Sequence, residues 1–192
     1  MGRRIRRVPV NLNIDDQRPV PFDEIKVILR GADELIMSGG RTLLAKILKG
    51  SRESKILELN LDRCPVYGYF KDHSIKAITT KIDWLILNEY LGIQYDDRLP
   101  LLVYTRKGWE IEMDTSSDEL LHEFDEMIAS GKTDFDMSCL KDRNREMILI
   151  LLNKVAATGD KKYIPILEAW KRIDYKKVRQ KINGVINKLQ RQ

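Results

Sequence analysis

Apolar positions recur with helical spacing along most of the chain, and glycine, proline or hydroxyl residues interrupt them. Isoleucine and leucine return every three or four positions from residue 25 to residue 36, and Ser38-Gly39-Gly40 then supplies residues that end a helix. Ser74 is of the residue type that opens a helix. The pattern predicts four helices in the first half of the chain: Asp23–Met37, Arg41–Lys49, a short helix from Ser51–Ser54 to about Leu59, and Ile75–Glu89.

A β-hairpin follows the fourth helix. Two segments rich in β-branched and aromatic residues, Tyr90–Tyr95 and Leu101–Tyr104, flank the turn-forming run Asp96-Asp97-Arg98. Helices that precede a closing hairpin are the plan of a winged helix-turn-helix. In that plan the helix after Ser74 is the recognition helix and the hairpin is the wing.

The second half of the chain is predicted to be helical throughout. One helix is expected at Ser117–Ala129, and three more at Arg145–Ala157, Tyr163–Lys171 and Tyr175–Leu189. The pair around Gly159 resembles one HEAT-type repeat. The predicted fold class is mainly α with a small β-wing, a winged helix-turn-helix followed by a C-terminal helical, HEAT-like segment.

Charge divides the chain into four segments. Residues 1–22 form a basic arm that is predicted to be extended, with an edge strand as one interpretation, and residues 23–109 form the winged-helix domain. Residues 110–137 carry ten carboxylates against one lysine, a net charge of −9, and form an acidic connector with one helix. Residues 138–192 hold 14 basic and five acidic residues, a net charge of +9, and form a basic helical tail. Such asymmetry favours binding to a polyanion, although solvated helix faces are the alternative interpretation.

Four short motifs within residues 43–108 carry a family resemblance. They are Lys49-Gly50-Ser51 with Lys55, Tyr67-Gly68-Tyr69 with Lys71-Asp72-His73-Ser74, the helix through Leu91, and Thr105-Arg106-Lys107-Gly108. In these motifs, over about a third of its length, the chain resembles the RQC domain of RecQ-type DNA helicases. The resemblance implies a module that binds DNA duplex ends and forks.

The resemblance also implies residue roles. A hydroxyl and a lysine at a helix N-terminus can hold a phosphate, and Ser51 and Ser74 each stand near lysines. By motif match, DNA phosphates are expected at Lys49, Ser51, Lys55 and Lys71, with ordinary capping as the alternative. The family usually has arginine where Lys49 stands, so this contact becomes a point charge. The full set of predicted DNA contacts is Lys49, Ser51, Lys55, Lys71, Ser74, Lys76, Arg98, Lys177, Lys181 and Lys188.

Aromatic contacts to DNA are less well supported by the sequence. Some RQC domains carry an aromatic wedge at the wing tip, whereas this tip offers only Leu99 beside two carboxylates, so no wedge is expected. Four other aromatic residues could stack on unpaired bases, although core packing is the favoured interpretation: Trp84, Tyr90, Tyr95 and Tyr104. The arginines Arg3, Arg4, Arg6 and Arg7 could follow a DNA groove or could form a solubilising terminus.

The signatures of an enzyme, a metal site and a membrane protein are missing. Gly40-Arg41-Thr42 lacks the glycine spacing and the lysine of a phosphate loop. Two cysteines without paired spacing and two histidines are too few for a structural zinc site. No apolar run approaches the roughly 20 residues that span a bilayer. We therefore predict no catalysis, no cofactor, no metal and no membrane association, and a cytoplasmic protein, nucleoid-associated if bacterial.

The sequence thus predicts a non-catalytic DNA-binding protein of replication, repair or recombination that binds duplex, duplex-end, fork or junction DNA. One alternative is a transcriptional regulator that reads an operator through outward residues of the recognition helix, namely Lys76, Thr79, Thr80, Lys81 and Asn88. Another is a protein-interaction module that docks on a helicase or other repair protein. A further hypothesis is that the connector partly masks the tail residues Lys176, Lys177, Lys181 and Lys188 until DNA displaces it.

Overall fold

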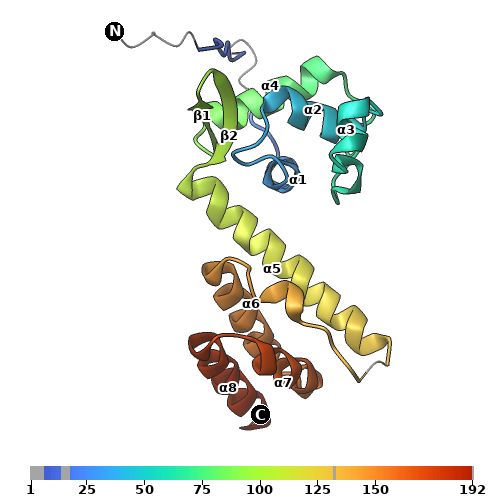
Figure 1. Cartoon of the computed structure of the whole chain (residues 1–192), viewed down its shortest axis with the longest axis vertical. Coiled ribbons are helices and arrows are strands. Elements are labelled where there is room, and N and C mark those ends of the chain that lie inside the picture. Colours follow the sequence, from blue (N-terminus) through green and yellow to red (C-terminus); the bar gives the residue numbers. More distant parts are fainter. Residues whose placement is uncertain (1–6, 14–17, 132, 192) are drawn as a thin grey trace. The chain divides into compact units, whose positions relative to one another are not determined.

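The structure is a computed structural model that describes residues 7–13, 18–131 and 133–191 (Figure 1). It divides into two compact units, residues 1–112 and residues 113–192, and each unit is described by itself. Arg3, Arg4 and Arg6 of the predicted arm lie outside the described residues. No helix within the described ranges is long and apolar enough to cross a membrane.

Unit 1 is a winged helix, as predicted. Its elements run from three helices and a 3₁₀ turn to the recognition helix, the hairpin and the beginning of a long helix (Figure 1). Their bounds are α1 (Phe22–Asp33), α2 (Arg41–Lys49), α3 (Ser54–Glu58), η1 (Leu61–Arg63), α4 (Ile75–Leu87), β1 (Leu91–Asp96), β2 (Leu99–Tyr104) and α5 (Arg106–Ala129).

The core of unit 1 is formed by the apolar faces of α1, α2 and α4. Leu44, Ile47 and Leu48 of α2 and Ile78 and Ile82 of α4 are all fully buried. These are the positions that keep helical spacing in the sequence. Burial of their side chains at about 1.5–3 kcal/mol each, more than helix propensity, holds α2 against the recognition helix.

The hairpin has a simple antiparallel register, with Leu91 opposite Tyr104 and Asp96 opposite Leu99. The other edge of β2 is also occupied. The Met37 amide donates to the Leu102 carbonyl at 3.0 Å, and the Leu102 amide donates to the Gly39 carbonyl at 2.8 Å. Because residues 37–39 bond to β2, α1 ends at Asp33 rather than at Met37 as the sequence pattern predicted.

The long helix α5 begins at Arg106, whereas the sequence predicted a helix starting at Ser117. Gly108 lies in the first turn of α5, where glycine is needed for a steric reason. A Cβ atom at this position would lie 1.9 Å from the Tyr90 carbonyl oxygen. The Thr105 hydroxyl accepts from the Gly108 amide at 3.2 Å and so satisfies an otherwise unpaired N–H of the first turn.

Unit 2 contains the remainder of α5 and the predicted C-terminal helices. Their bounds are η2 (Ser138–Leu140), α6 (Arg145–Thr158), η3 (Lys161–Tyr163), α7 (Ile164–Ile173) and α8 (Lys176–Arg191). α8 packs against both α6 and α7. Trp170 is fully buried, meets Phe124 edge-on and donates to Asp174 at 2.7 Å. The likeness to a HEAT repeat stays a prediction.

Candidate nucleic-acid interface

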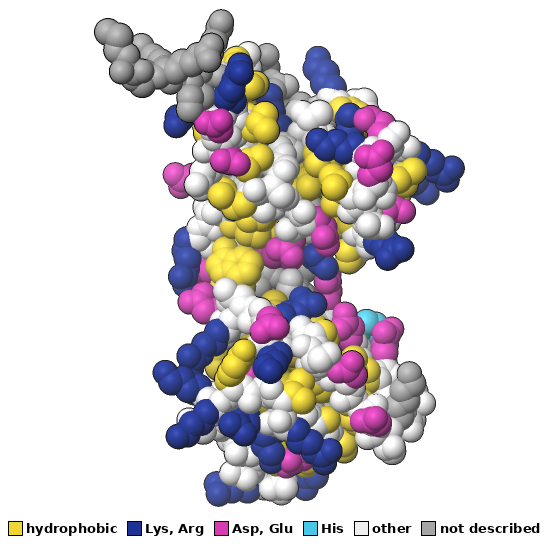
Figure 2. All heavy atoms as spheres, viewed as in Figure 1, with side chains coloured by type: hydrophobic (Ala, Val, Ile, Leu, Met, Phe, Trp, Pro, Cys, Tyr) yellow, Lys and Arg dark blue, Asp and Glu magenta, His cyan; other side chains and the backbone are white. Residues whose placement is uncertain are grey.

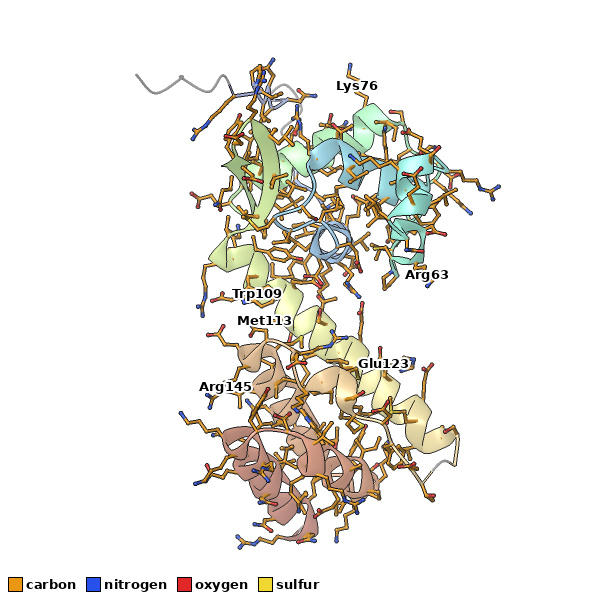
Figure 3. The ribbon with its side chains drawn as sticks, in the orientation of Figure 1. Arg63, Lys76, Trp109, Met113, Glu123 and Arg145 are labelled. Atoms are coloured by element: carbon orange, nitrogen blue, oxygen red, sulfur yellow. The ribbon has the colours of Figure 1, made fainter. Side chains whose placement is uncertain are left out.

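The N-terminus of α4 is exposed and capped as predicted. The Ser74 hydroxyl accepts from the Ala77 amide at 3.1 Å, and Ile75 and Lys76 in the first turn face solvent. Figure 3 shows the Lys76 side chain extending away from the ribbon. Unpaired amides and the helix dipole make such a terminus favourable for an anion.

The turn before α4 is fixed to the end of α2. The Gly68 amide donates to the Ile47 carbonyl at 3.0 Å, and the Phe70 amide donates to the Leu48 carbonyl at 2.8 Å. Gly50 and Gly68 both adopt positive φ, at 76° and 72°, and a Cβ on Gly50 would lie 3.0 Å from the Gly68 Cα. Glycine at both positions lets the two backbones approach closely and holds the turn in one place.

This junction brings several predicted contacts together. The Lys49 amino group donates to the Lys71 carbonyl, which places the end of α2 beside the approach to α4. Lys71, Ser74 and Lys76 are exposed there, and the carboxylate of Asp72 is exposed among them. We call Lys49, Lys71, Ser74 and Lys76 the α4 cap site.

Ser51 and Lys55 have different surroundings. The hydroxyls at Ser51–Ser54 were predicted to cap α3, and this is wrong, because the N-cap is Glu53 and no side chain caps the helix. The Ser51 hydroxyl instead accepts from the Glu53 amide at 3.4 Å. The Glu53 carboxylate pairs with Lys46 at 2.6 Å, and this hydrogen bond lowers the pKa of Glu53. Glu53, whose carboxylate pairs with Lys46, thus separates Ser51 from Lys55 in the sequence.

Lys55 also lines a hollow of about 410 Å³. Its other walls come from β2, the start of α2 and residues 8–10, and Lys46 and Arg41 contribute to its lining. Among the described residues, no hydrogen bond or ion pair joins Lys55 to the α4 cap site.

The wing tip matches its predicted chemistry. Asp97 adopts positive φ at 52°, and Asp96, Asp97 and Arg98 are all exposed. Leu99 is 61% exposed and is the apolar side chain at the tip. The Arg98 carbonyl accepts from the Val8 amide at 3.0 Å, so the arm reaches the wing.

Residues 7–13 of the arm form no strand, contrary to the edge strand considered from the sequence. Besides the backbone bond from Val8 to Arg98, side chains hold this segment in place. The Asn13 amide donates to the buried Asp83 carboxylate at 2.9 Å, and Asp83 is paired with Arg41. Arg41 also donates to the Asn11 carbonyl at 2.7 Å. The segment therefore lies against α4 and the wing.

The outward residues of α4 that could read bases are already engaged. The Thr79 hydroxyl donates to the Ile75 carbonyl, and Thr80 bonds to the Lys76 carbonyl and to the side-chain amide of Asn13. Lys81 pairs with Glu24, and Asn88 donates to the Trp84 carbonyl. Of the predicted reading set, only the Lys76 side chain has no such bond among the described residues, a pattern that favours phosphate contact over sequence reading.

The four aromatic residues considered for stacking are partly buried. Trp84 stacks on Tyr90 with centroids 5.9 Å apart. The hydroxyl groups of Tyr95 and Tyr104 donate to the Val8 and Leu29 carbonyls at 2.9 Å, and burial raises the pKa of Tyr104. Core packing was the favoured prediction for this set. Trp84, Tyr90 and Tyr104 do pack against the core of unit 1, whereas Tyr95 contacts the arm instead.

Sequence reasoning missed Tyr69. Its side chain is 54% exposed, although it lies in the fixed turn before α4. The available signal was the run Tyr67-Gly68-Tyr69-Phe70, which puts three aromatic residues into one turn. A turn of this length can bury only some of them.

Unit 2 presents the predicted lysines of the tail. Val178, Ile182 and Leu189 of α8 are buried, and the opposite side exposes Lys177, Lys181 and Lys188, which we call the tail lysines. No carboxylate among the described residues pairs with them. Figure 2 shows Lys and Arg side chains spread over unit 2.

The acidic residues of α5 pair elsewhere than the masking hypothesis assumed. Asp114 and Asp118 contact Lys154 at 2.8 and 2.5 Å, and Asp125 contacts Lys162 at 2.8 Å. Hydrogen bonds from Lys162 and then from Tyr163 lower the pKa of Asp125. The connector thus neutralises lysines of α6 and η3 and leaves the tail lysines exposed.

Part of this chain is similar to known proteins. The family model of the RQC domain matches residues 22–120. The ATP-dependent DNA helicase RecQ of Bacillus subtilis is 32% identical over 69 residues, which are 36% of this chain and 12% of the helicase. The chain therefore spans only a small part of that relative. No solved structure matches it.

Proposed function

Because the chain belongs to the RQC domain family, we propose that it is a non-catalytic DNA-binding protein that holds duplex ends, forks or junctions by their phosphates. Its setting would be replication, repair or recombination, in the cytoplasm or on a nucleoid. The RecQ relative is named as a DNA helicase, and a helicase or another repair protein is the protein partner we propose.

The observation that carries the proposal is the α4 cap site. Three lysines and a capping serine, from the end of α2, the turn before α4 and the start of α4, lie at one exposed helix N-terminus. The close contact of Gly50 and Gly68 fixes their spacing before any ligand binds. Pre-positioned cations beside unpaired amides suit a phosphate, and they contain no group that distinguishes one base from another.

Phosphate binding also accounts better for this surface than operator reading does. The hydroxyl and amide groups along α4 that could contact bases are bonded to the backbone or to the arm. An operator-reading protein would need those groups available in the major groove. The tail lysines would add a second, sequence-independent contact to DNA.

A binding panel tests the proposal. The full chain is titrated against single-stranded DNA, blunt duplex, a fork and a four-way junction of mixed sequence at several salt concentrations. We expect duplex-containing substrates to bind best, to bind equally when the sequence is changed, and to weaken steeply with salt. Binding that requires one particular sequence, or affinity that does not respond to salt, would refute the proposal.

A further inference from the structure

Tyr69 presents an aromatic ring that unit 1 does not use in its core. The ring is 54% exposed, whereas the adjacent Phe70 is 3% exposed. The hydroxyl of neighbouring Tyr67 donates to the Ser51 carbonyl at 3.0 Å. Among the three aromatic residues of this turn, Tyr69 alone is left facing solvent.

The ring is held in a fixed position. Phe70 meets Tyr69 edge-on, with centroids 5.0 Å apart and planes at 86°, and meets His73 at 5.2 Å on another side. The Tyr69 amide donates to the Val66 carbonyl at 3.1 Å, and the Phe70 amide anchors the turn to α2. A ring that is already ordered loses little conformational entropy when a ligand stacks on it.

The surroundings of the ring are cationic. Tyr69 and Lys71 are separated by one residue, so their Cα atoms lie at most about 7.6 Å apart. The Lys71 carbonyl accepts from Lys49, which completes the link to the α4 cap site. An exposed aromatic ring beside a phosphate-binding group is the combination that single-stranded nucleic acid uses, because every base has a face that can stack.

We propose that Tyr69 is a stacking platform for an unpaired base next to a duplex end whose phosphate lies at the α4 cap site. This inference rests on the proposed function and adds a preference for single-strand–duplex junctions. It also assigns the aromatic contact to the approach to α4, since the wing tip offers only Leu99.

The test compares a blunt duplex with the same duplex carrying a two-nucleotide overhang. The full chain should bind the overhang substrate about 5- to 150-fold more tightly, the range expected for one stacked base. Tyr69→Leu keeps an apolar side chain but no ring, and should lose this preference. Tyr69→Phe should retain it. The salt dependence should be the same in all three proteins, because no charge changes.

Phe22→Ala is the matched control. Phe22 is an exposed aromatic residue of the same unit, at 56%, and lies outside the α4 cap site. Its removal should leave the overhang preference intact. A 2-aminopurine base in the overhang gives a second readout, since its fluorescence should fall on binding to the wild-type and Tyr69→Phe proteins but not to Tyr69→Leu.

The outcomes separate the two ideas. If Tyr69→Leu weakens blunt and overhang substrates equally, or weakens neither, the stacking role is overturned while the proposed function stands. If the wild-type chain binds none of these DNA substrates, the proposed function fails first and the stacking role fails with it.

Discussion

The α4 cap site makes a quantitative prediction for the double variant Lys49→Gln, Lys71→Gln. The Lys49 amino group has three N–H donors, of which one is used on the Lys71 carbonyl, so two remain for a phosphate. Each lysine that neutralises one phosphate contributes about −0.9 to the slope of log affinity against log salt. The double variant should therefore lose about 1.8 from this slope.

That difference is large enough to measure. When salt rises from about 50 to about 200 mM, the affinity deficit of the double variant relative to wild type should shrink about twelve-fold. Fluorescence anisotropy with a labelled blunt duplex measures both slopes. Glutamine keeps much of the side-chain length, and the exposed Lys71 carbonyl can bond to water once Lys49 is gone, so the fold should be retained.

Lys26→Gln is the matched control for this experiment. Lys26 is half-buried like Lys49, but it lies in α1 with its amino group 5.2 Å from the Phe22 ring centroid. Its slope and affinity should equal those of wild type. A folded double variant that also binds DNA with the wild-type slope would show that phosphate does not lie at the α4 cap site.

Three further predictions concern stability and the tail. Gly108→Ala should strongly lower the melting temperature, since its Cβ would lie 1.9 Å from the Tyr90 carbonyl oxygen. Gly184→Ala, on the open surface of α8, should instead raise stability by up to about 1 kcal/mol. Equal melting curves for the two variants would contradict this prediction. Changing all three tail lysines to Gln should lower DNA affinity and reduce the salt slope by about 2.7 in a folded protein, and an unchanged slope would make the tail a structural or protein-docking element. The pKa of Asp125 is lowered in the folded protein, so its contribution to stability is complete above the unfolded pKa of about 3.9 and is lost as the pH falls through the lower folded pKa. Asp125→Asn should therefore weaken the acid sensitivity of unit 2 in a circular-dichroism titration. Identical acid transitions in the two proteins would exclude that role.

Local features of this fold were readable from the sequence because their causes are local. Arg41–Lys49 was predicted with the bounds it has, since Gly39-Gly40 precedes the helix and Gly50 ends it at a positive φ. The cap at Ser74 and the hairpin turn at Asp97 likewise depend on neighbours in the chain.

The differences between the predicted and the observed structure come from contacts between residues that are distant in the sequence. Nothing near Gly108 in the sequence shows that the Tyr90 carbonyl occupies the space of its Cβ, and the helix that contains this glycine was predicted to start only at Ser117. The pairing of residues 37–39 with β2 and the burial of Asp83 against Arg41 have the same origin. Both join segments that lie more than 40 residues apart in the chain.

Only part of the candidate site was predictable, because some of its contacts also join residues that are distant in the sequence. The lysines around Ser74 were found through their motif, but their meeting with Lys49 depends on the packing of α2 beside the turn at Gly68. The exposure of Tyr69 depends on which ring of the turn the core accepts, and that is decided by three-dimensional packing.

The contacts of the arm with the wing and α4 influence the order in which the parts of unit 1 fold. The contacts of Val8 with Arg98 and Tyr95, and of Asn13 with Asp83, join residues 70 to 90 positions apart. During synthesis the arm leaves the ribosome before its partners in α4 and the hairpin are made. Contacts of such long sequence separation form late in folding. The arm therefore closes over a helical core that has already formed, and its contacts slow the unfolding of unit 1 more than they speed its folding.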